Sequence, residues 1–321
     1  MRKAPSFRRS ADDRLFRLGT GIFAFLVVLL VAAIGYELFK NSRLSIAKFG
    51  LAFWRTKTWD PVAGDFGALP FIWGTLYSSF LALLISTPIA IGIAIFLSEL
   101  APRRIRTPLA FLTELLAAIP SIVYGLWGIF VLVPIARHLE TSTPDWLKKV
   151  PLFSGPPLGV GMLSAGLILA VMVIPFTSSV AREVLKAVPA TQREAAYALG
   201  ATRWEAIQTA LRYGRTGIFG AVILGLGRAI GETMAVTMVI GNNPQVSLSL
   251  FAPQYSMAAV IANEFTEAAD DLYLNALIEI GLVLFVITLV INALSRLLIW
   301  RVSREVKVKE PRRVPAPAAA A

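Results

Sequence analysis

Six long apolar segments constrain the fold of this chain more than any other feature of its sequence. They cover about residues 18–39, 71–97, 109–136, 159–180, 216–240 and 272–300. A helix that crosses the hydrocarbon core of a bilayer needs roughly 20 apolar residues. The mean hydropathy of +0.67 agrees with that interpretation. The sequence therefore predicts an all-α integral membrane protein with six transmembrane helices.

The basic residues indicate how these segments are oriented. With the N-terminus inside, 22 lysines and arginines fall on the inner side and eight on the outer connections. Cytoplasmic loops carry such an excess, so both termini are predicted to face the cytoplasm. The chain then divides into a cytoplasmic N-terminal segment (1–17), a transmembrane domain (18–300) and a cytoplasmic tail (301–321). The tail is rich in proline and alanine from Glu310 onward and is expected to be disordered.

Several classes of function are disfavoured by what the chain lacks. It has no cysteine and one histidine, His138, so thiolate and histidine metal sites are not expected. No Gly-Lys dipeptide occurs, so there is no Walker A phosphate loop, and the chain is not expected to hydrolyse ATP. The net charge of +11 lies in short clusters between apolar segments, which does not favour nucleic-acid binding. We therefore predict no metal, no cofactor and no catalytic residues.

The inner loop 181–215 is predicted to hold two short helices joined at a glycine. Pro189 stops the preceding segment, and Thr191 with Glu194 has the spacing of a capping box at a helix N-terminus. Gly200 suits the left-handed conformation that ends many helices. Thr202 with Glu205 has the same capping spacing and is expected to start the second helix. An ordinary surface hairpin is one interpretation of this loop. A helix-turn-helix that binds DNA is excluded because membrane segments tether both ends.

The fifth segment carries two charges among apolar residues. Arg228 lies near its middle, where an arginine costs at least about 2.5–3.5 kcal/mol on the insertion scale. Glu232 follows four residues later, so the two side chains are expected to share one helix face. Either they only neutralise each other, or Arg228 offers donors to a passing oxyanion. Glu114, in the third segment, is expected to lie near the inner membrane surface. A stripe of small residues should let this helix pack closely on another: Gly217, Ala221, Gly225 and Ala229.

The inner loop resembles a known element of membrane transporters. Glu194, Ala195, Ala196 and Gly200 match, at the same spacing, the EAA loop of permease subunits in ATP-binding-cassette importers. The resemblance implies that these four residues dock on a separate ATPase subunit and transmit its movement to the spans.

Two other stretches narrow this resemblance. Residues 120–128 and 225–242 are similar to signature stretches of the C-type permeases of phosphate importers (PstC). The resemblance implies a type I importer (MetI-like) bundle in the bacterial inner membrane, with Arg228 and Glu232 on the substrate pathway. It also implies three kinds of partner: a second permease, two copies of an ATP-binding subunit and a periplasmic phosphate-binding protein. Molybdate or sulfate as the substrate, or a stand-alone ion-coupled transporter, remain open from the residues alone.

Overall fold

The computed structural model of the chain describes residues 11–304, with side chains over 13–301. The predicted disorder of the tail from Glu310 therefore lies outside the described residues, as do residues 1–10 of the N-terminal segment. The described part is almost entirely helical, with one two-stranded antiparallel hairpin. The first half of the described chain contains α1 (Ala11–Asn41), α2 (Arg43–Phe49), η1 (Gly50–Trp54), β1 (Trp59–Asp60), β2 (Asp65–Phe66), α3 (Leu69–Ile95), η2 (Phe96–Leu100), α4 (Arg103–Ala117), α5 (Ser121–Trp127), η3 (Gly128–Leu132), α6 (Val133–Thr141) and α7 (Asp145–Lys148). The second half contains α8 (Met162–Lys186), α9 (Ala190–Ala198), α10 (Arg203–Ile230), α11 (Met234–Val239), α12 (Met257–Glu264) and α13 (Asp271–Arg304). Among these, η1 is a 3-10 helix, and η2 and η3 are π-helical turns.

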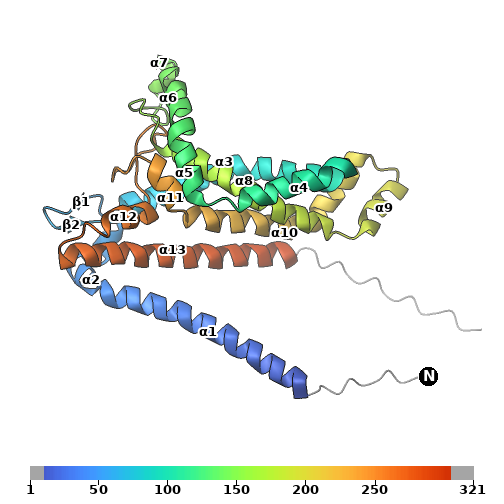
Figure 1. The fold of residues 1–321 in the computed structure, drawn as a ribbon, viewed down its shortest axis with the longest axis horizontal. Helices are drawn as coiled ribbons and strands as arrows, with labels where there is room; N and C mark the ends of the chain where they lie inside the picture. The colour runs from blue at the N-terminus through green and yellow to red at the C-terminus, as the bar shows by residue number, and fades with distance from the viewer. Residues whose placement is uncertain (1–10, 305–321) are drawn as a thin grey trace, which may run out of the picture.

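The long helices form a bundle with two different ends. Helices α3, α8, α10 and α13 run side by side, with α9 at one end and the β1–β2 hairpin at the other (Figure 1). We call these the elbow end and the hairpin end. Five stretches of the described chain are long and apolar enough to cross a membrane: 13–41, 69–100, 121–141, 162–186 and 271–301. The first, second, fourth and sixth predicted segments are thus confirmed as helical spans.

The third predicted segment, 109–136, is wrong as one continuous helix. Helix α4 ends at Ala117 and α5 begins after Pro120, and the span lies over 121–141 instead. The cause is Pro120, which has no N–H and disfavours helical geometry at the residue before it. Helices α5 and α6 then rise steeply away from the other long helices (Figure 1).

The predicted limits of two further helices are also wrong. These are the fifth apolar segment, 216–240, and the second short helix of the inner loop. They form one 28-residue helix, α10, which starts at Arg203 and stops at Ile230, and the separate α11 starts at Met234. The intervening Gly231, Glu232 and Thr233 are not helical. The apolar run is therefore split, which is why α10 is not among the stretches that meet the length and apolarity criteria.

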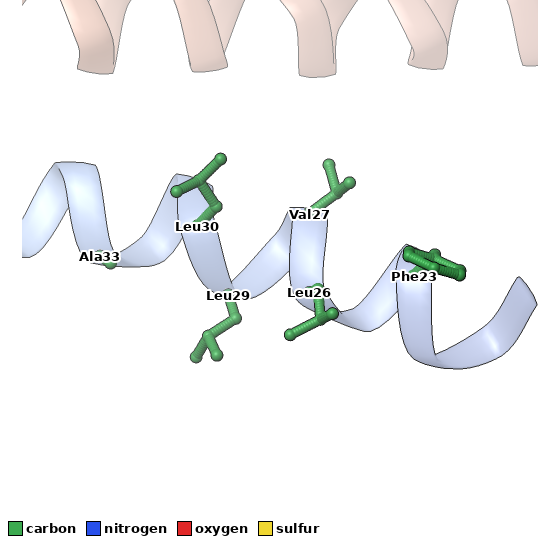
Figure 2. Close-up of a pocket in the computed structure, with 6 residues that line it drawn as sticks. All are labelled: Phe23, Leu26, Val27, Leu29, Leu30 and Ala33. Carbon is green, nitrogen blue, oxygen red and sulfur yellow. The ribbon is translucent and has the colours of Figure 1, made fainter. Parts of the chain in front are cut away.

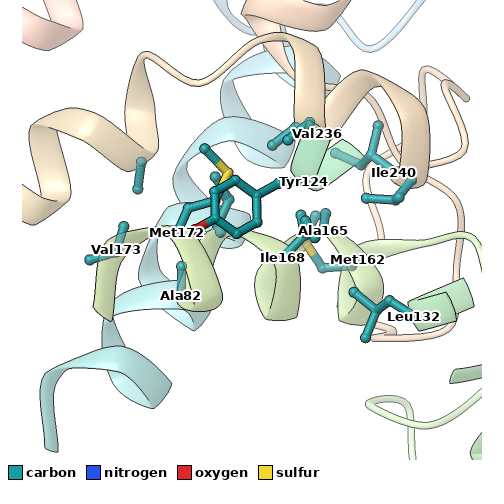
Figure 3. Packing of buried hydrophobic residues seen from close by; sticks show 14 of the residues in the cluster. Ala82, Tyr124, Leu132, Met162, Ala165, Ile168, Met172, Val173, Val236 and Ile240 are labelled. Carbon is teal, nitrogen blue, oxygen red and sulfur yellow. The ribbon is translucent and has the colours of Figure 1, made fainter. Parts of the chain in front are cut away.

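The main core lies between α3, α5, α8 and α11. Tyr124, Met172, Val236 and Ile240 meet there with small residues such as Ala82 and Ala165, as Figure 3 shows. The predicted stripe of small residues packs on α8: a Cβ at Gly217 would lie 2.6 Å from Val184, and one at Gly225 would lie 2.5 Å from the Thr177 hydroxyl. Because these glycines have no side chain, α10 and α8 can approach each other closely.

A second core closes the hairpin end. Phe53, Phe66 and Phe71 are buried with Tyr255 from the loop before α12 and with Leu277 of α13. Trp59 lies against this cluster and donates a hydrogen bond from Nε1 to Glu264 over 2.8 Å. The hairpin is therefore a packed part of the fold.

Helix α1 stands apart from the bundle along most of its length. Its second half meets α13, where Gly35 lies against the Phe285 ring. Further toward the N-terminus its apolar side chains are exposed, and Figure 2 shows Val27 and Leu30 pointing toward the neighbouring ribbon and Leu26 and Leu29 away from it. The hollow beside them is lined by apolar side chains of α1 only, so it offers no polar group to a ligand.

Candidate functional site

The glycine elbow between α9 and α10 has the predicted geometry. Gly200 has a φ of +81°, and its N–H donates to the Tyr197 carbonyl over 2.9 Å. The N–H of Ala201 donates to the Ala196 carbonyl over 3.1 Å. These two bonds form a Schellman motif, which satisfies carbonyls at the end of α9 and needs a left-handed residue. A Cβ at this position would meet nothing within 4 Å, so space does not exclude a side chain. Glycine is favoured instead by the positive φ, which other residues rarely adopt.

Of the two predicted capping boxes, one is confirmed and one is wrong. The Thr202 N–H donates to Glu205 over 2.7 Å, and Thr202 accepts from the Glu205 N–H over 3.4 Å. The bond from the Thr202 N–H, then that from its hydroxyl, lowers the pKa of the Glu205 carboxyl. At α9 the N-cap is Pro189 with no side-chain bond. Thr191 cannot cap because it already lies inside the helix, whereas an N-cap needs a non-helical backbone.

One side of α9 is exposed at the elbow, and the other side is partly buried. Glu194 and Ala195 are exposed, as is Gly200, and Leu199 is 90% exposed. Ala196 is half-buried on the inner side, so the four motif residues do not share one surface equally. Tyr197 and Trp204, on either side of Leu199 in the sequence, are exposed as well, so several apolar side chains lie on the surface of this turn.

Arg193 ties α9 to the rest of the bundle. It donates to the Glu99 carboxylate through Nε, over 3.1 and 3.2 Å, and through Nη2, over 2.5 Å. It also donates to the Val188 and Leu185 carbonyls, over 3.0 and 2.9 Å. Sequence reasoning missed this pair, because the two residues are 94 positions apart and nothing in the sequence pattern connects them.

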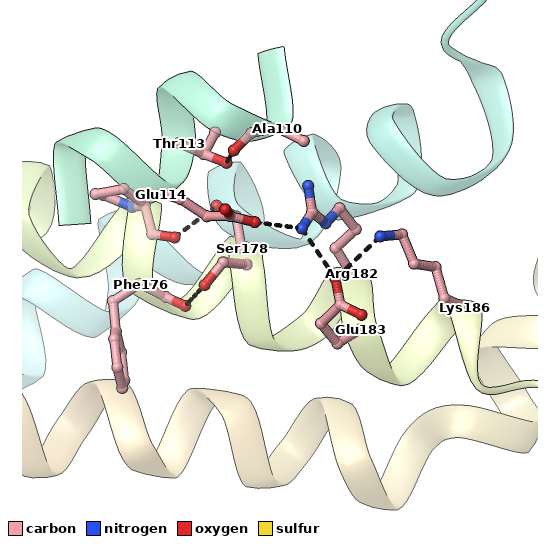
Figure 4. A network of polar contacts seen from close by, with 10 residues as sticks. Ala110, Thr113, Glu114, Phe176, Ser178, Arg182, Glu183 and Lys186 are labelled. Atoms are coloured by element: carbon pink, nitrogen blue, oxygen red, sulfur yellow. Dashed lines mark hydrogen bonds and ion pairs between the residues drawn. The ribbon is translucent and has the colours of Figure 1, made fainter. Parts of the chain in front are cut away.

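A second ion-pair network joins α4 to α8 near the elbow end (Figure 4). Arg182 is buried and donates to Glu114 over 2.7 Å and to Glu183 over 2.9 Å. Lys186 donates to Glu183 over 3.0 Å. Glu114 is half exposed, as its predicted place near the membrane surface requires, but it pairs with an arginine that the sequence had placed in the inner loop.

Arg228 occupies the last turn of α10, beside the break that precedes α11. Its guanidinium carbon lies 5.6 Å from the centre of the Phe176 ring. The side chain is half-buried, and its buried Nε has no hydrogen-bond partner. Within the described part of the chain, no hydrogen bond or ion pair uses this guanidinium.

Glu232 lies past the end of α10, so the predicted shared helix face is wrong. Gly231 ends the helix, and Glu232 accepts the Ala235 N–H, in the first turn of α11, over 3.3 Å. The two charges still lie close in sequence at one break, but they form no ion pair with each other in this single chain. Arg228 is left with donors that a ligand can use.

Comparison with known proteins identifies the chain's relationships. Residues 86–304 match the family described as "Binding-protein-dependent transport system inner membrane component". The chain belongs to this family. The matched region begins within α3 and includes the elbow, the Arg228 break and all of α13.

Named relatives cover almost all of the chain. The phosphate transport system permease protein PstC of Pasteurella multocida is 50% identical over 91% of this chain and 93% of its own length. The protein of that name from Mesorhizobium japonicum is 45% identical over 94% of both chains. Both relatives are named as permease proteins of phosphate transport systems.

A solved structure confirms the predicted MetI-like bundle. A chain of the inward-facing MetNI methionine ABC transporter superposes with a TM-score of 0.54 at 15% identity. The match covers 72% of this chain and 94% of that chain. At this identity the likeness establishes the fold alone. The fold agrees with the prediction that the chain crosses the membrane several times.

Proposed function

We propose that this chain is one permease subunit of an ATP-driven importer that moves inorganic phosphate across the bacterial inner membrane. The observation that carries the proposal is the match, over nine-tenths of the chain, to relatives named phosphate transport permeases. The distribution of lysine and arginine supports placing the elbow and both termini on the cytoplasmic side.

The elbow is the docking surface for the ATPase in this proposal. Glu194, Ala195 and Gly200 present a small, stiff outer face, and Leu199 beside them is almost fully exposed. The Schellman turn fixes the angle between α9 and α10. A push on the elbow is therefore transmitted along α10 rather than absorbed by a flexible loop.

Helix α10 connects this docking surface to the proposed substrate site. It is continuous from Arg203 to Ile230, about 40 Å at 1.5 Å per residue, and Arg228 lies at its far end. Movement of the elbow then shifts Arg228 relative to α8 and α5. The unused guanidinium donors suit the oxygens of a tetrahedral oxyanion, and the nearby Glu232 carboxylate limits how tightly an anion is held.

The exposure of Arg228 in a single copy supports a second permease subunit among the proposed partners. Arg228 is only half-buried in one chain, and a charged group at membrane depth needs cover from protein or water. A second permease supplies that cover, two ATP-binding subunits dock at the elbows, and a periplasmic phosphate-binding protein delivers the anion at the hairpin end.

Reconstitution tests the proposal directly. The purified chain, with its co-expressed permease, ATPase and binding protein, is placed in liposomes and supplied with radiolabelled phosphate. We expect uptake that requires ATP and that excess unlabelled phosphate suppresses, whereas sulfate and molybdate do not. Uptake by this chain without the ATPase indicates a stand-alone transporter, and suppression by sulfate or molybdate instead indicates another oxyanion.

A further inference from the structure

Glu99 lies where α3 turns into α4. It belongs to η2, the single π-helical turn that ends the long helix, and Ala101 and Pro102 after it are extended. Such π-turns are rare and occur frequently at functional positions. The Glu99 side chain is only 13% exposed, unlike the other elbow-end carboxylates Glu114 and Glu183.

Both sides of the elbow are bound to this one residue. Its carboxylate accepts the bonds from Arg193 of α9, and its backbone carbonyl accepts a bond from Arg203 of α10 over 2.8 Å. Arg193 also binds the Val188 and Leu185 carbonyls beyond α8 and in its last turn. One glutamate thus joins the α3–α4 corner to α9 and α10, while Arg193 adds the end of α8.

We propose that Glu99 is a positioning residue for coupling, which fastens the elbow to the α3–α4 corner so that α4 moves with it. This inference rests on the proposed function, because it concerns how an ATPase-driven movement of the elbow reaches the substrate site. A partly buried, multiply bonded arginine–carboxylate pair is both strong and specific in geometry. A lysine cannot reproduce its planar fork.

Helix α4 then forms a second connection from the elbow to the surroundings of Arg228. Its far end carries the Leu116 carbonyl, which accepts a bond from the Tyr124 hydroxyl over 2.8 Å. Tyr124 in turn belongs to the buried cluster that also holds Ala229, the residue next to Arg228. Between these points, Glu114 of α4 is bound to the buried Arg182 of α8. Helix α10 moves Arg228 itself, and α4 moves the wall beside it.

Two single variants and one double variant test this role. Glu99→Gln keeps the shape but removes the charge, and Arg193→Lys keeps the charge but removes the fork. Glu99→Arg combined with Arg193→Glu restores an opposite-charge pair. Asp145→Asn is the matched control, because it breaks the exposed 3.4 Å pair with Lys148, which is not part of the elbow.

The measurements are the ATPase retained per permease after purification and the phosphate moved per ATP hydrolysed in proteoliposomes. We expect normal retention and continued ATP hydrolysis for Glu99→Gln and Arg193→Lys. Phosphate moved per ATP should fall by about tenfold, in keeping with the loss of a charged hydrogen bond, and should recover in the double variant. An unchanged ratio overturns the proposal. Loss of the complex with an unchanged ratio in what remains also overturns it, because the pair is then only structural.

A distance measurement separates this inference from the proposed function. The chain has no cysteine, so spin labels go to Thr107→Cys in α4 and Thr191→Cys in α9, both exposed. We expect one narrow distance in the assembled complex, with and without ATP, and a broad distribution after Glu99→Gln. Equal distributions overturn the role of Glu99. Absence of ATP-driven phosphate uptake by the unaltered complex overturns the proposed function instead and leaves this result standing.

Discussion

Arginine side chains at the elbow end and at the Arg228 break differ in their hydrogen bonding. At the elbow end, Arg193 and Arg182 are each bound to carboxylates, and Arg193 also binds two carbonyls. At the break, Arg228 contacts an aromatic ring and makes no hydrogen bond within the described part of the chain. Arginines that are bound to carboxylates hold helices together. In the proposed function, Arg228 keeps its free donors for a ligand, which would offset the cost of placing a charge within the membrane.

The largest expected effect comes from Arg228→Gln. Uptake of phosphate should fall by roughly 10- to 100-fold or more, because a hydrogen bond between charged groups contributes about 1.5–3 kcal/mol. The complex should still assemble, since no described residue depends on the guanidinium for a hydrogen bond. Arg228→Lys is the matched variant, and it should retain part of the uptake because it keeps the charge but not the planar fork.

Uptake by assembled complexes is measured with radiolabelled phosphate and normalised to the ATPase subunit. Normal uptake by Arg228→Gln would falsify the ligand role of Arg228, and the contrast between the two regions would then have no functional meaning.

Arg182→Met should have the opposite effect to Arg228→Gln, because it should lower the stability of the chain. We expect a loss of stability of about 1–3 kcal/mol, because the buried hydrogen bonds to Glu114 and Glu183 are lost. The cost stays below that of a fully buried pair because both carboxylates are more than half exposed and remain hydrated. Thermal unfolding in detergent measures it.

Lys186→Gln is the control for that experiment, since its pair with Glu183 is exposed and should contribute less than about 1 kcal/mol. Arg228→Gln should leave the melting temperature nearly unchanged. If Arg182→Met also melts like the unaltered chain, the arginines bound to carboxylates are not the structural ones.

The sequence predicted those parts of the fold that depend on neighbouring residues. The Thr202–Glu205 box, the Gly200 turn and the close approach at Gly217 and Gly225 all follow from short-range spacing, and all are present. Glycine alone, however, did not reveal where helices end. Gly214 lies inside α10 because Val184 and Val188 pack on it, whereas Gly231 ends the same helix.

The ion pairs show why the rest of the site escaped prediction. Arg193 and Glu99 are 94 residues apart, and Arg182 and Glu114 are 68 apart, so only the packed bundle brings them together. The break after Arg228 leaves Glu232 outside α10, where it accepts the Ala235 N–H. A helical wheel, which assumes a continuous helix, necessarily placed both charges on one face.

Gly200→Ala sharpens the comparison at the elbow. A left-handed backbone costs a non-glycine residue roughly 1–2 kcal/mol, so the turn between α9 and α10 should loosen. We expect weaker retention of the ATPase subunit with little change in overall melting. Gly220→Ala is the control, because this helical glycine of α10 has open space around it and alanine should be neutral or stabilising. Equal retention for both variants would show that the turn geometry does not matter for docking.

Thr202→Ala should have the smallest effect, and its pH dependence identifies the cause. Bonds from the Thr202 N–H and hydroxyl hold the pKa of Glu205 below its ordinary value. A carboxyl whose pKa is lowered on folding contributes stability above its unfolded pKa and loses that contribution as the pH falls through the folded pKa. Alanine keeps the N–H bond and loses the hydroxyl bond, so the melting temperatures of Thr202→Ala and the unaltered chain should differ most at neutral pH and less below the carboxyl range. A difference that stays constant down to acidic pH would assign the effect to the threonine cap alone. The Thr202 hydroxyl would then contribute nothing through the Glu205 charge, in contrast to the charge-dependent Glu99–Arg193 pair next to it.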